Sequence, residues 1–179
     1  HPHPLFDGTM DNKVVTTLGK SYLDAGINVV RFNFRGVGQS EGSYGDVDGE
    51  VEDCLSVYYW LSQNHEVSRL FLAGFSFGSY IAAKAAQLLK EDVSIPHLML
   101  MAPSVENSPY EQATPFTLPV SVMMGRLDEV VPFESVSNWV QDQRGGIEFI
   151  EFPEGSHFFH GQLIIMRNHI KGILARYLS

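Results

Sequence analysis

The stretch LFLAGFSFGSYIAAKAA, residues 70–86, carries the feature that decides the fold. A run of apolar residues typical of a buried strand passes directly into an alanine-rich helical segment, and Ser76 lies at the junction between Gly74 and Gly78. The pattern G-x-S-x-G is typical of a strained strand-to-helix turn that presents the serine hydroxyl above the end of a sheet. Glycine is expected at both positions because a larger side chain would collide with backbone in so tight a turn. A Gly-Ser turn without chemistry is the alternative interpretation.

Strands and helices are predicted to alternate along the rest of the chain. Short apolar runs, typical of strands buried on both faces, are separated by segments of helical periodicity. The predicted strands are 27–34, 69–75, 97–103, 120–126 and 147–153. The predicted helices are 11–26, 50–63, 79–90, 132–143 and 161–179. This alternation predicts an α/β fold with a parallel sheet, and we expect one domain over residues 1–179.

The composition narrows the class of function. The chain has 179 residues, 44% of them hydrophobic, and a formal net charge of −9. Its 12 Lys and Arg are scattered along the chain, so we expect no nucleic-acid partner. No apolar run approaches the roughly 18 residues of a membrane span, and the single cysteine, Cys54, falls at a helical core position. We therefore expect a cytoplasmic protein with no membrane partner, and the sequence favours no oligomeric state.

Two residues later in the chain could activate Ser76. A serine hydroxyl needs a base and an orienting carboxylate to act as a nucleophile at neutral pH. Asp128 follows one predicted strand and His157 follows the next, in the chain order that the nucleophile-elbow pattern requires. We predict Ser76, Asp128 and His157 as the catalytic residues, meeting at the carboxyl edge of the sheet. The amide of Phe77, at the start of the following helix, is the predicted donor to an oxyanion.

Each of these assignments has an alternative. Asp128 could simply cap the helix that begins near Pro132, and Glu129 competes with it for the acid role. His160 competes with His157, and one of the two histidines could be a surface or packing residue. His157 is favoured because it stands in the turn directly after the strand.

Four stretches together resemble a known family. They are HPHPLFDGTMDNKVV, RFNFRGVGQSEG, LAGFSFG and SHFFH, which match motifs of small bacterial hydrolases without a cap in the α/β-hydrolase superfamily. The resemblance covers nearly the whole chain. It implies the α/β-hydrolase fold, a mostly parallel twisted sheet with helices on both faces and no cap domain. It also implies that the N-terminal strands, roughly thirty residues ending in the third strand of the sheet, lie upstream of His1.

In that family the loop after the third strand supplies a second oxyanion amide. Proline has no N–H, so Pro2 and Pro4 are excluded, and the expected donor is His3 with Leu5 as the fallback. His1 is expected to brace this loop by hydrogen bonding. A metal site at His1 and His3 is not expected, because no carboxylate or cysteine lies at ligand spacing. We expect no cofactor.

The segment RFNFRGVGQS has a possible nucleotide-binding interpretation that we reject. Gly36 and Gly38 are not followed by a third glycine that opens a helix, nor by an acidic residue at the next strand's end. We expect a tight loop beside the pocket. Arg35 is expected to pair with an acidic neighbour such as Asp46 or Asp48 in a structural role.

The predicted triad and the resemblance together imply a serine hydrolase that cleaves small carboxylic esters or thioesters through an acyl-enzyme. Only residues 104–119 separate two strands at the point where relatives usually insert a lid, so an open, shallow pocket is expected. Its predicted walls are Leu5, Phe75, Phe77, Tyr110, Phe116 and Phe158. The alternatives are a non-catalytic binding module with the hydrolase fold, and an acyltransferase or peptidase using the same triad.

Overall fold

The computed structural model describes residues 1–143 and 146–178. In chain order the elements are η1 (Pro4–Phe6), α1 (Lys13–Asp24), α2 (Asp48–Asn64), β1 (Leu72–Phe75), α3 (Phe77–Leu89), β2 (Leu98–Met101), η2 (Tyr110–Gln112), β3 (Val120–Gly125), α4 (Phe133–Asp142), β4 (Glu148–Phe152) and α5 (Leu163–Leu174). Each predicted helix is confirmed within these residues, and residue 179 of the predicted last helix lies outside them. Four of the five predicted strands are confirmed in the same part of the chain.

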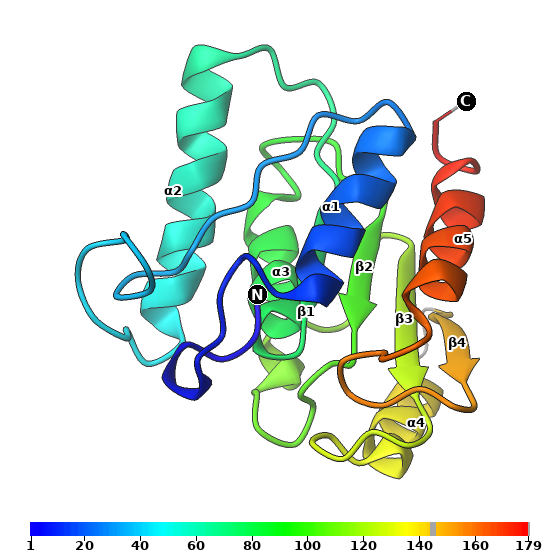
Figure 1. Ribbon diagram of the computed structural model, residues 1–179. Helices are drawn as coiled ribbons and strands as arrows, with labels where there is room; N and C mark the ends of the chain where they lie inside the picture. Colours follow the sequence, from blue (N-terminus) through cyan, green and yellow to red (C-terminus); the bar gives the residue numbers. More distant parts are fainter. Residues whose placement is uncertain (144–145, 179) are drawn as a thin grey trace.

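The four strands form one parallel sheet in the order β1-β2-β3-β4 among the described residues. Leu72 lies opposite Leu98, and Ser121 lies opposite Glu148, so each strand is in register with its neighbour. Every residue of β2 and β3 is buried, which explains why these strands read as continuous apolar runs. Because the strands all run the same way, their carboxyl ends meet at one edge of the sheet, the lower edge in Figure 1.

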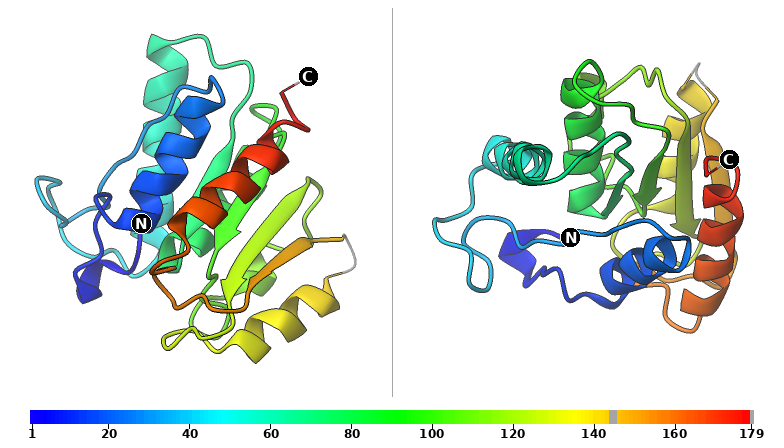
Figure 2. Two further views of the ribbon diagram at one scale, coloured as in Figure 1. Left: turned by 45° about the vertical axis from the view of Figure 1, so that its right-hand side comes forward. Right: turned by 90° about the horizontal axis from the view of Figure 1, so that it is seen from above.

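Helices cover both faces of this sheet. Figure 2 shows α1 and α5 together on one face and α3 and α4 on the other, with α2 packed outside α3. The apolar side chains of both layers and of the sheet form a continuous core. None of the helices in the described residues is long and apolar enough to cross a membrane.

The prediction of a strand at 27–34 is wrong for the described structure. These residues form an irregular connection between α1 and the loop before α2 (Figure 1). A cavity of about 680 Å³ lies between this segment and β1, and residues from both line it. A strand exists only where backbone groups pair with a neighbour, and the described residues place none within reach of 27–34. The β-branched and aromatic side chains of residues 27–34 therefore line this cavity.

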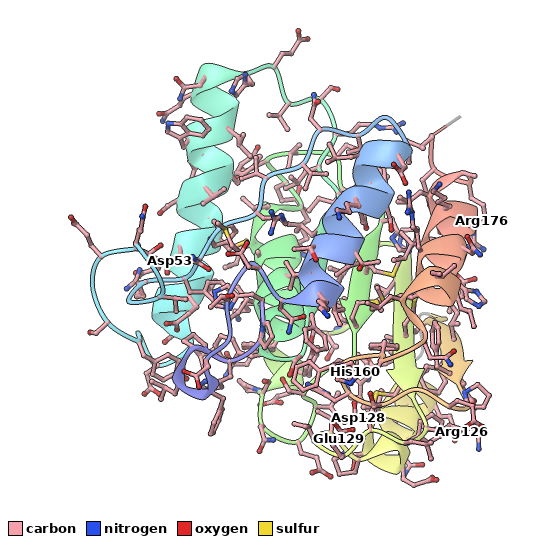
Figure 3. All side chains as sticks on the ribbon, in the orientation of Figure 1. Asp53, Arg126, Asp128, Glu129, His160 and Arg176 are labelled. Carbon is pink, nitrogen blue, oxygen red and sulfur yellow. The ribbon has the colours of Figure 1, made fainter. Side chains whose placement is uncertain are left out.

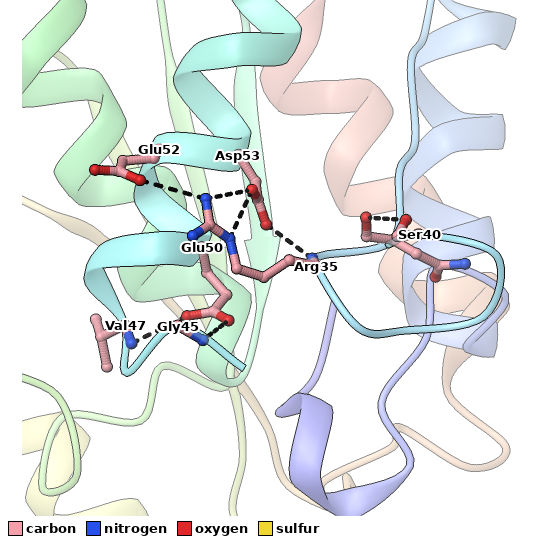
Figure 4. A network of polar contacts seen from close by, with 8 residues as sticks. Arg35, Ser40, Gly45, Val47, Glu50, Glu52 and Asp53 are labelled. Atoms are coloured by element: carbon pink, nitrogen blue, oxygen red, sulfur yellow. Dashed lines mark hydrogen bonds and ion pairs between the residues drawn. The ribbon is translucent and has the colours of Figure 1, made fainter. Parts of the chain in front are cut away.

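Arg35 fastens the loop after this segment to α2, as Figure 4 shows. The guanidinium forms ion pairs with Asp53 at 2.8 Å and Glu52 at 3.3 Å. Asp53 also accepts the backbone N–H of Arg35 at 2.8 Å. The expected partners Asp46 and Asp48 are therefore wrong, because Asp53 engages the main chain and the side chain of Arg35 at once. The structural role expected for Arg35 is confirmed.

Candidate active site

Ser76 lies at the sharp turn between β1 and α3. Its backbone has φ 53° and ψ −122°, a conformation that side-chain-bearing residues rarely adopt and that stores roughly 1–3 kcal/mol of strain. A Cβ added at Gly74 would lie 2.0 Å from the Gly78 carbonyl oxygen, and one at Gly78 would lie 2.6 Å from backbone atoms of His1. Both glycines are therefore required by close backbone approach, as the G-x-S-x-G pattern predicted.

The structure brings Ser76, His157 and Asp128 into one hydrogen-bonded chain. Ser76 Oγ lies 3.1 Å from His157 Nε2, and His157 Nδ1 lies 2.8 Å from Asp128 Oδ2. An ionised carboxylate only accepts, so Nδ1 carries the proton and Nε2 of a neutral ring is free to accept from the serine. The side chains of His157 and Asp128 are 3% and 0% exposed. Water therefore competes little for these bonds.

Asp128 is itself held by its second oxygen. Oδ1 accepts the backbone N–H groups of Val130 at 2.8 Å and Val131 at 2.7 Å. The carboxylate therefore does cap a backbone turn, as the alternative interpretation allowed. It caps the loop, however, because α4 has Pro132 as its N-cap. One carboxylate thus fixes the loop and orients the imidazole.

Glu129 and His160, the alternatives for the acid and base roles, are not part of the hydrogen-bonded triad. Glu129 Oε2 accepts the backbone N–H of His157 at 3.1 Å, so it contacts the main chain of the histidine and not its ring. His160 is exposed, and its ring lies 5.9 Å from that of Phe158. Figure 3 shows Asp128, Glu129 and His160 gathered at the same edge of the sheet, with Arg176 at the other end. The contact of Glu129 was missed from the sequence, where its only signal was adjacency to Asp128.

The two predicted oxyanion donors, the backbone amides of Phe77 and His3, have no acceptor among the described residues. Phe77 N–H is the first amide of α3, which has no partner within its own helix, and His3 N–H is also without one. The His3 and Phe77 rings lie 4.6 Å apart, so the two segments are in contact. Leu5 N–H donates to His3 Nδ1 at 3.2 Å, so the amide of Leu5, the fallback oxyanion donor, already has an acceptor. Gly78 N–H donates to the His1 carbonyl at 3.0 Å and holds the loop against the helix.

His1 braces this loop as expected. Its Nδ1 donates to the Pro2 carbonyl at 2.7 Å, and its Nε2 accepts the Phe34 N–H at 3.0 Å. Burial lowers the pKa of His3, with the Glu50 carboxylate opposing that effect, so the His3 ring is neutral and can accept from Leu5. Within the part of the chain that the structure describes, no three His, Cys, Asp or Glu side chains converge as metal ligands.

The predicted pocket walls differ in where they lie. Leu5 is 65% exposed in η1, and the ring of Phe158 lies 5.1 Å from that of His157. Phe75 is fully buried under His157, at 5.0 Å between ring centroids, and Tyr110 is also buried. Phe75 and Tyr110 therefore support the site from beneath and present no surface to a ligand.

Phe116 is not brought to the site. It lines a cavity of about 10 Å³ with Val120 and Ile147, which lie at the amino ends of β3 and β4, and its ring packs on Trp139. The cavity of about 680 Å³ beside 27–34 is lined by residues that flank Ser76 in the chain, such as Phe75 and Gly78. Ser76 itself is not among its lining residues. We assign the site on the bonded geometry at Ser76 and not on cavity size.

Comparison with known proteins places the chain in a family. Residues 11–116 match the model of a family described as "Serine aminopeptidase, S33". The chain belongs to this family of α/β serine hydrolases. A serine hydrolase homologue of the same class from Coxiella burnetii is 44% identical, with a TM-score of 0.90 over 97% of this chain and 82% of that one.

Two further relatives of this serine hydrolase are similar to it over most of their length. An α/β serine hydrolase without a lid from Xanthomonas campestris is 35% identical, with a TM-score of 0.93 over 100% of this chain and 80% of that one. An uncharacterized protein of Rickettsia prowazekii is 33% identical over 168 residues, which are 89% of this chain and 69% of that protein. The implied fold without a cap is confirmed, since the described residues between β2 and β3 hold only η2.

Proposed function

We propose that this serine hydrolase cleaves small carboxylic esters or thioesters through an acyl-enzyme formed on Ser76. The observation that carries the proposal is the continuous chain Ser76 Oγ, His157 imidazole and Asp128 carboxylate, with contacts of 3.1 and 2.8 Å. The arrangement supplies a nucleophile, a base in hydrogen-bond reach, and a carboxylate that fixes the tautomer of that base.

In the acylation step, Ser76 Oγ forms a bond to the substrate carbonyl carbon while His157 Nε2 takes the hydroxyl proton. Asp128 stabilises the imidazolium that results, and its own position is fixed by the Val130 and Val131 amides. The bond from the tetrahedral carbon to the alcohol or thiol then breaks. His157 returns its proton to that leaving group, and the acyl group stays on Ser76.

The negative charge of the tetrahedral intermediate falls on the former carbonyl oxygen. Phe77 N–H and His3 N–H are the proposed donors, and both lack another acceptor among the described residues. The amino end of α3 adds the positive end of its dipole at the same point. A water molecule, deprotonated by His157, then attacks the acyl carbon. The bond from that carbon to Ser76 Oγ breaks, the proton on His157 returns to Oγ, and the carboxylic acid leaves.

Small substrates fit the short connections around the site. The described segment 102–119 carries no lid, and Leu5 of η1 is largely exposed. We expect turnover to fall for acyl chains beyond about eight carbons, because an open, shallow site buries little of a longer chain. Faster hydrolysis of p-nitrophenyl decanoate than of the butyrate would contradict this expectation.

The direct test is hydrolysis of p-nitrophenyl acetate and butyrate by the wild-type protein and by Ser76→Ala. We expect the substitution to lower kcat by about 10³-fold or more, as removal of a nucleophile does in triad enzymes. Undiminished turnover by Ser76→Ala would remove Ser76 from the mechanism.

The family description favours a second candidate, release of an N-terminal amino acid from a peptide. The same triad can attack an amide, provided that the site holds the α-ammonium group of the substrate. Amino acid p-nitroanilides separate the two candidates. If they turn over faster than the acetate and butyrate esters, peptide cleavage replaces ester cleavage as the proposed reaction.

A further inference from the structure

A chain of buried hydroxyl groups lies directly under the nucleophile turn. Tyr110, from η2, places its hydroxyl 2.7 Å from Ser79 Oγ, and Ser79 Oγ in turn contacts the backbone carbonyl of Ser76. Tyr110 is 2% exposed and Ser79 is fully buried. The proposed reaction uses neither side chain.

The direction of each hydrogen bond follows from what its atoms can do. The Ser76 carbonyl only accepts, so the Ser79 hydroxyl donates its single proton there. Ser79 Oγ can then only accept from Tyr110, whose phenol is kept protonated because burial raises its pKa. Ser79 N–H donates to the same carbonyl at 2.9 Å. The Ser76 carbonyl therefore receives two hydrogen bonds, and one of them is reinforced by the phenol.

This carbonyl shares a peptide group with the proposed oxyanion donor. The C=O of Ser76 and the N–H of Phe77 belong to one planar unit and point in opposite directions. Fixing the carbonyl therefore fixes the direction of the N–H. Hydrogen bonds to the carbonyl also polarise the unit, which makes its N–H a stronger donor.

We infer that Tyr110 and Ser79 are positioning residues that orient and polarise the Ser76–Phe77 peptide for binding the oxyanion. The inference rests on the proposed function, since it concerns the intermediate of that reaction. It assigns the segment between β2 and β3 a part in transition-state stabilisation, through η2 and without contact with the substrate.

A purely structural role for Tyr110 is the competing explanation. Its ring packs against Tyr80 at 5.3 Å and Trp139 at 4.8 Å, and these contacts anchor η2 to α3 and α4. Tyr110→Phe keeps the ring and removes only the hydroxyl. A structural role would lower thermal stability and leave kcat unchanged, whereas the positioning role lowers kcat with KM nearly constant.

The experiment compares Tyr110→Phe, Ser79→Ala and the double variant, with Tyr58→Phe as the matched control. Tyr58 is also buried, but it lies on α2 in a separate cluster with Leu89 and Val93. With p-nitrophenyl acetate we expect Tyr110→Phe to lower kcat by about tenfold with KM within twofold, a fraction of the loss caused by removing an oxyanion donor. The double variant should be no worse than Ser79→Ala, because the tyrosine acts through the serine.

A trifluoromethyl ketone supplies the second readout, because its adduct with serine carries the oxyanion. We expect its Ki to rise by about tenfold in Tyr110→Phe and to stay unchanged in Tyr58→Phe, in parallel with kcat. Unchanged kcat and Ki in both Tyr110→Phe and Ser79→Ala, or additive losses in the double variant, would overturn the inference while leaving the proposed function intact. A wild-type protein that hydrolyses no ester would instead overturn the proposed function.

Discussion

The two ends of the sheet each hold a serine, a histidine and a carboxylate. Only at one end do the hydrogen bonds let the histidine act as a base towards the serine. At the carboxyl edge, the carboxylate of Asp128 binds the imidazole of His157, and the imidazole faces Ser76. At the amino edge, His97 Nε2 lies 2.9 Å from Ser121 Oγ, and Ser121 donates to Glu148 at 2.7 Å.

The order of the bonds separates the two sets. Ser121 already donates to a carboxylate, so His97 Nε2 must donate to the serine and cannot take its proton. His97 Nδ1 is buried without a partner among the described residues, and Glu148 is held by Arg176. Residue types alone therefore do not make a triad. The order of their hydrogen bonds and the strained turn that carries Ser76 do.

The largest effect that tests this difference is at Asp128. Asp128→Asn should lower kcat for p-nitrophenyl acetate by about 10³–10⁴-fold, because the amide no longer holds the acceptor tautomer of His157. Steady-state kinetics at pH 7 measures it, with circular dichroism to show that the variant is folded. A loss below tenfold would mean that Asp128 does not orient His157.

The second effect is on stability, at the amino edge. Burial lowers the pKa of His97 to about 4, with Glu148 opposing this and Arg176 adding to it, against about 6.5 in the unfolded chain. His97 is neutral in the folded state, so the unfolded state binds more protons between these values. The contribution of His97 to the free energy of unfolding is therefore complete above about pH 6.5. It falls by at most about 3 kcal/mol as the pH drops towards 4.

Urea unfolding at pH 7 and pH 4.5 measures this loss. His97→Gln should flatten the pH dependence, and His169→Gln, at an exposed position, should leave it as in the wild type. Identical pH dependence in the wild type and His97→Gln would contradict the assignment.

A smaller effect is expected at Ser121. Ser121→Ala should leave kcat within about twofold and lower the free energy of unfolding by about 1–3 kcal/mol, since Glu148 and His97 each lose a partner. Activity and urea unfolding of one preparation give both values. A tenfold loss of activity with unchanged stability would reverse the roles of the two edges.

The smallest effect is expected at Glu129. Glu129→Gln keeps an oxygen that can accept the His157 backbone N–H, so kcat should fall by less than about fivefold. The matched comparison is Asp128→Asn, the same chemical change one residue away. Equal losses in the two variants would show that Glu129 shares the acid role.

Much of the site follows from local sequence, and the part that does not depends on contacts between distant segments. Ser76 and its two glycines are fixed by the turn itself, and Asp128 and His157 by the ends of their strands. The sequence does not identify Asp53 as the partner of Arg35, because the pairing depends on which turn of α2 faces the loop. The sequence predicts Tyr110 as a pocket wall, whereas its hydroxyl contacts Ser79 and its side chain is buried.

The same reason explains the errors at 27–34 and at Phe116. Residues 27–34 have the composition of a strand, but a strand also needs a neighbour, which composition does not report. Phe116 lies in the irregular segment before β3, whose path back to the amino end of the sheet has no periodic signal.

The central claim is that His157 and Asp128 activate Ser76 as a nucleophile. Its most direct test is labelling of the purified protein with a fluorophosphonate probe, followed by peptide mass spectrometry. The account predicts one phosphonylated residue, Ser76, with labelling lost in Ser76→Ala and retained in Ser121→Ala. Absence of labelling in the folded wild-type protein, or labelling at another serine, would contradict it.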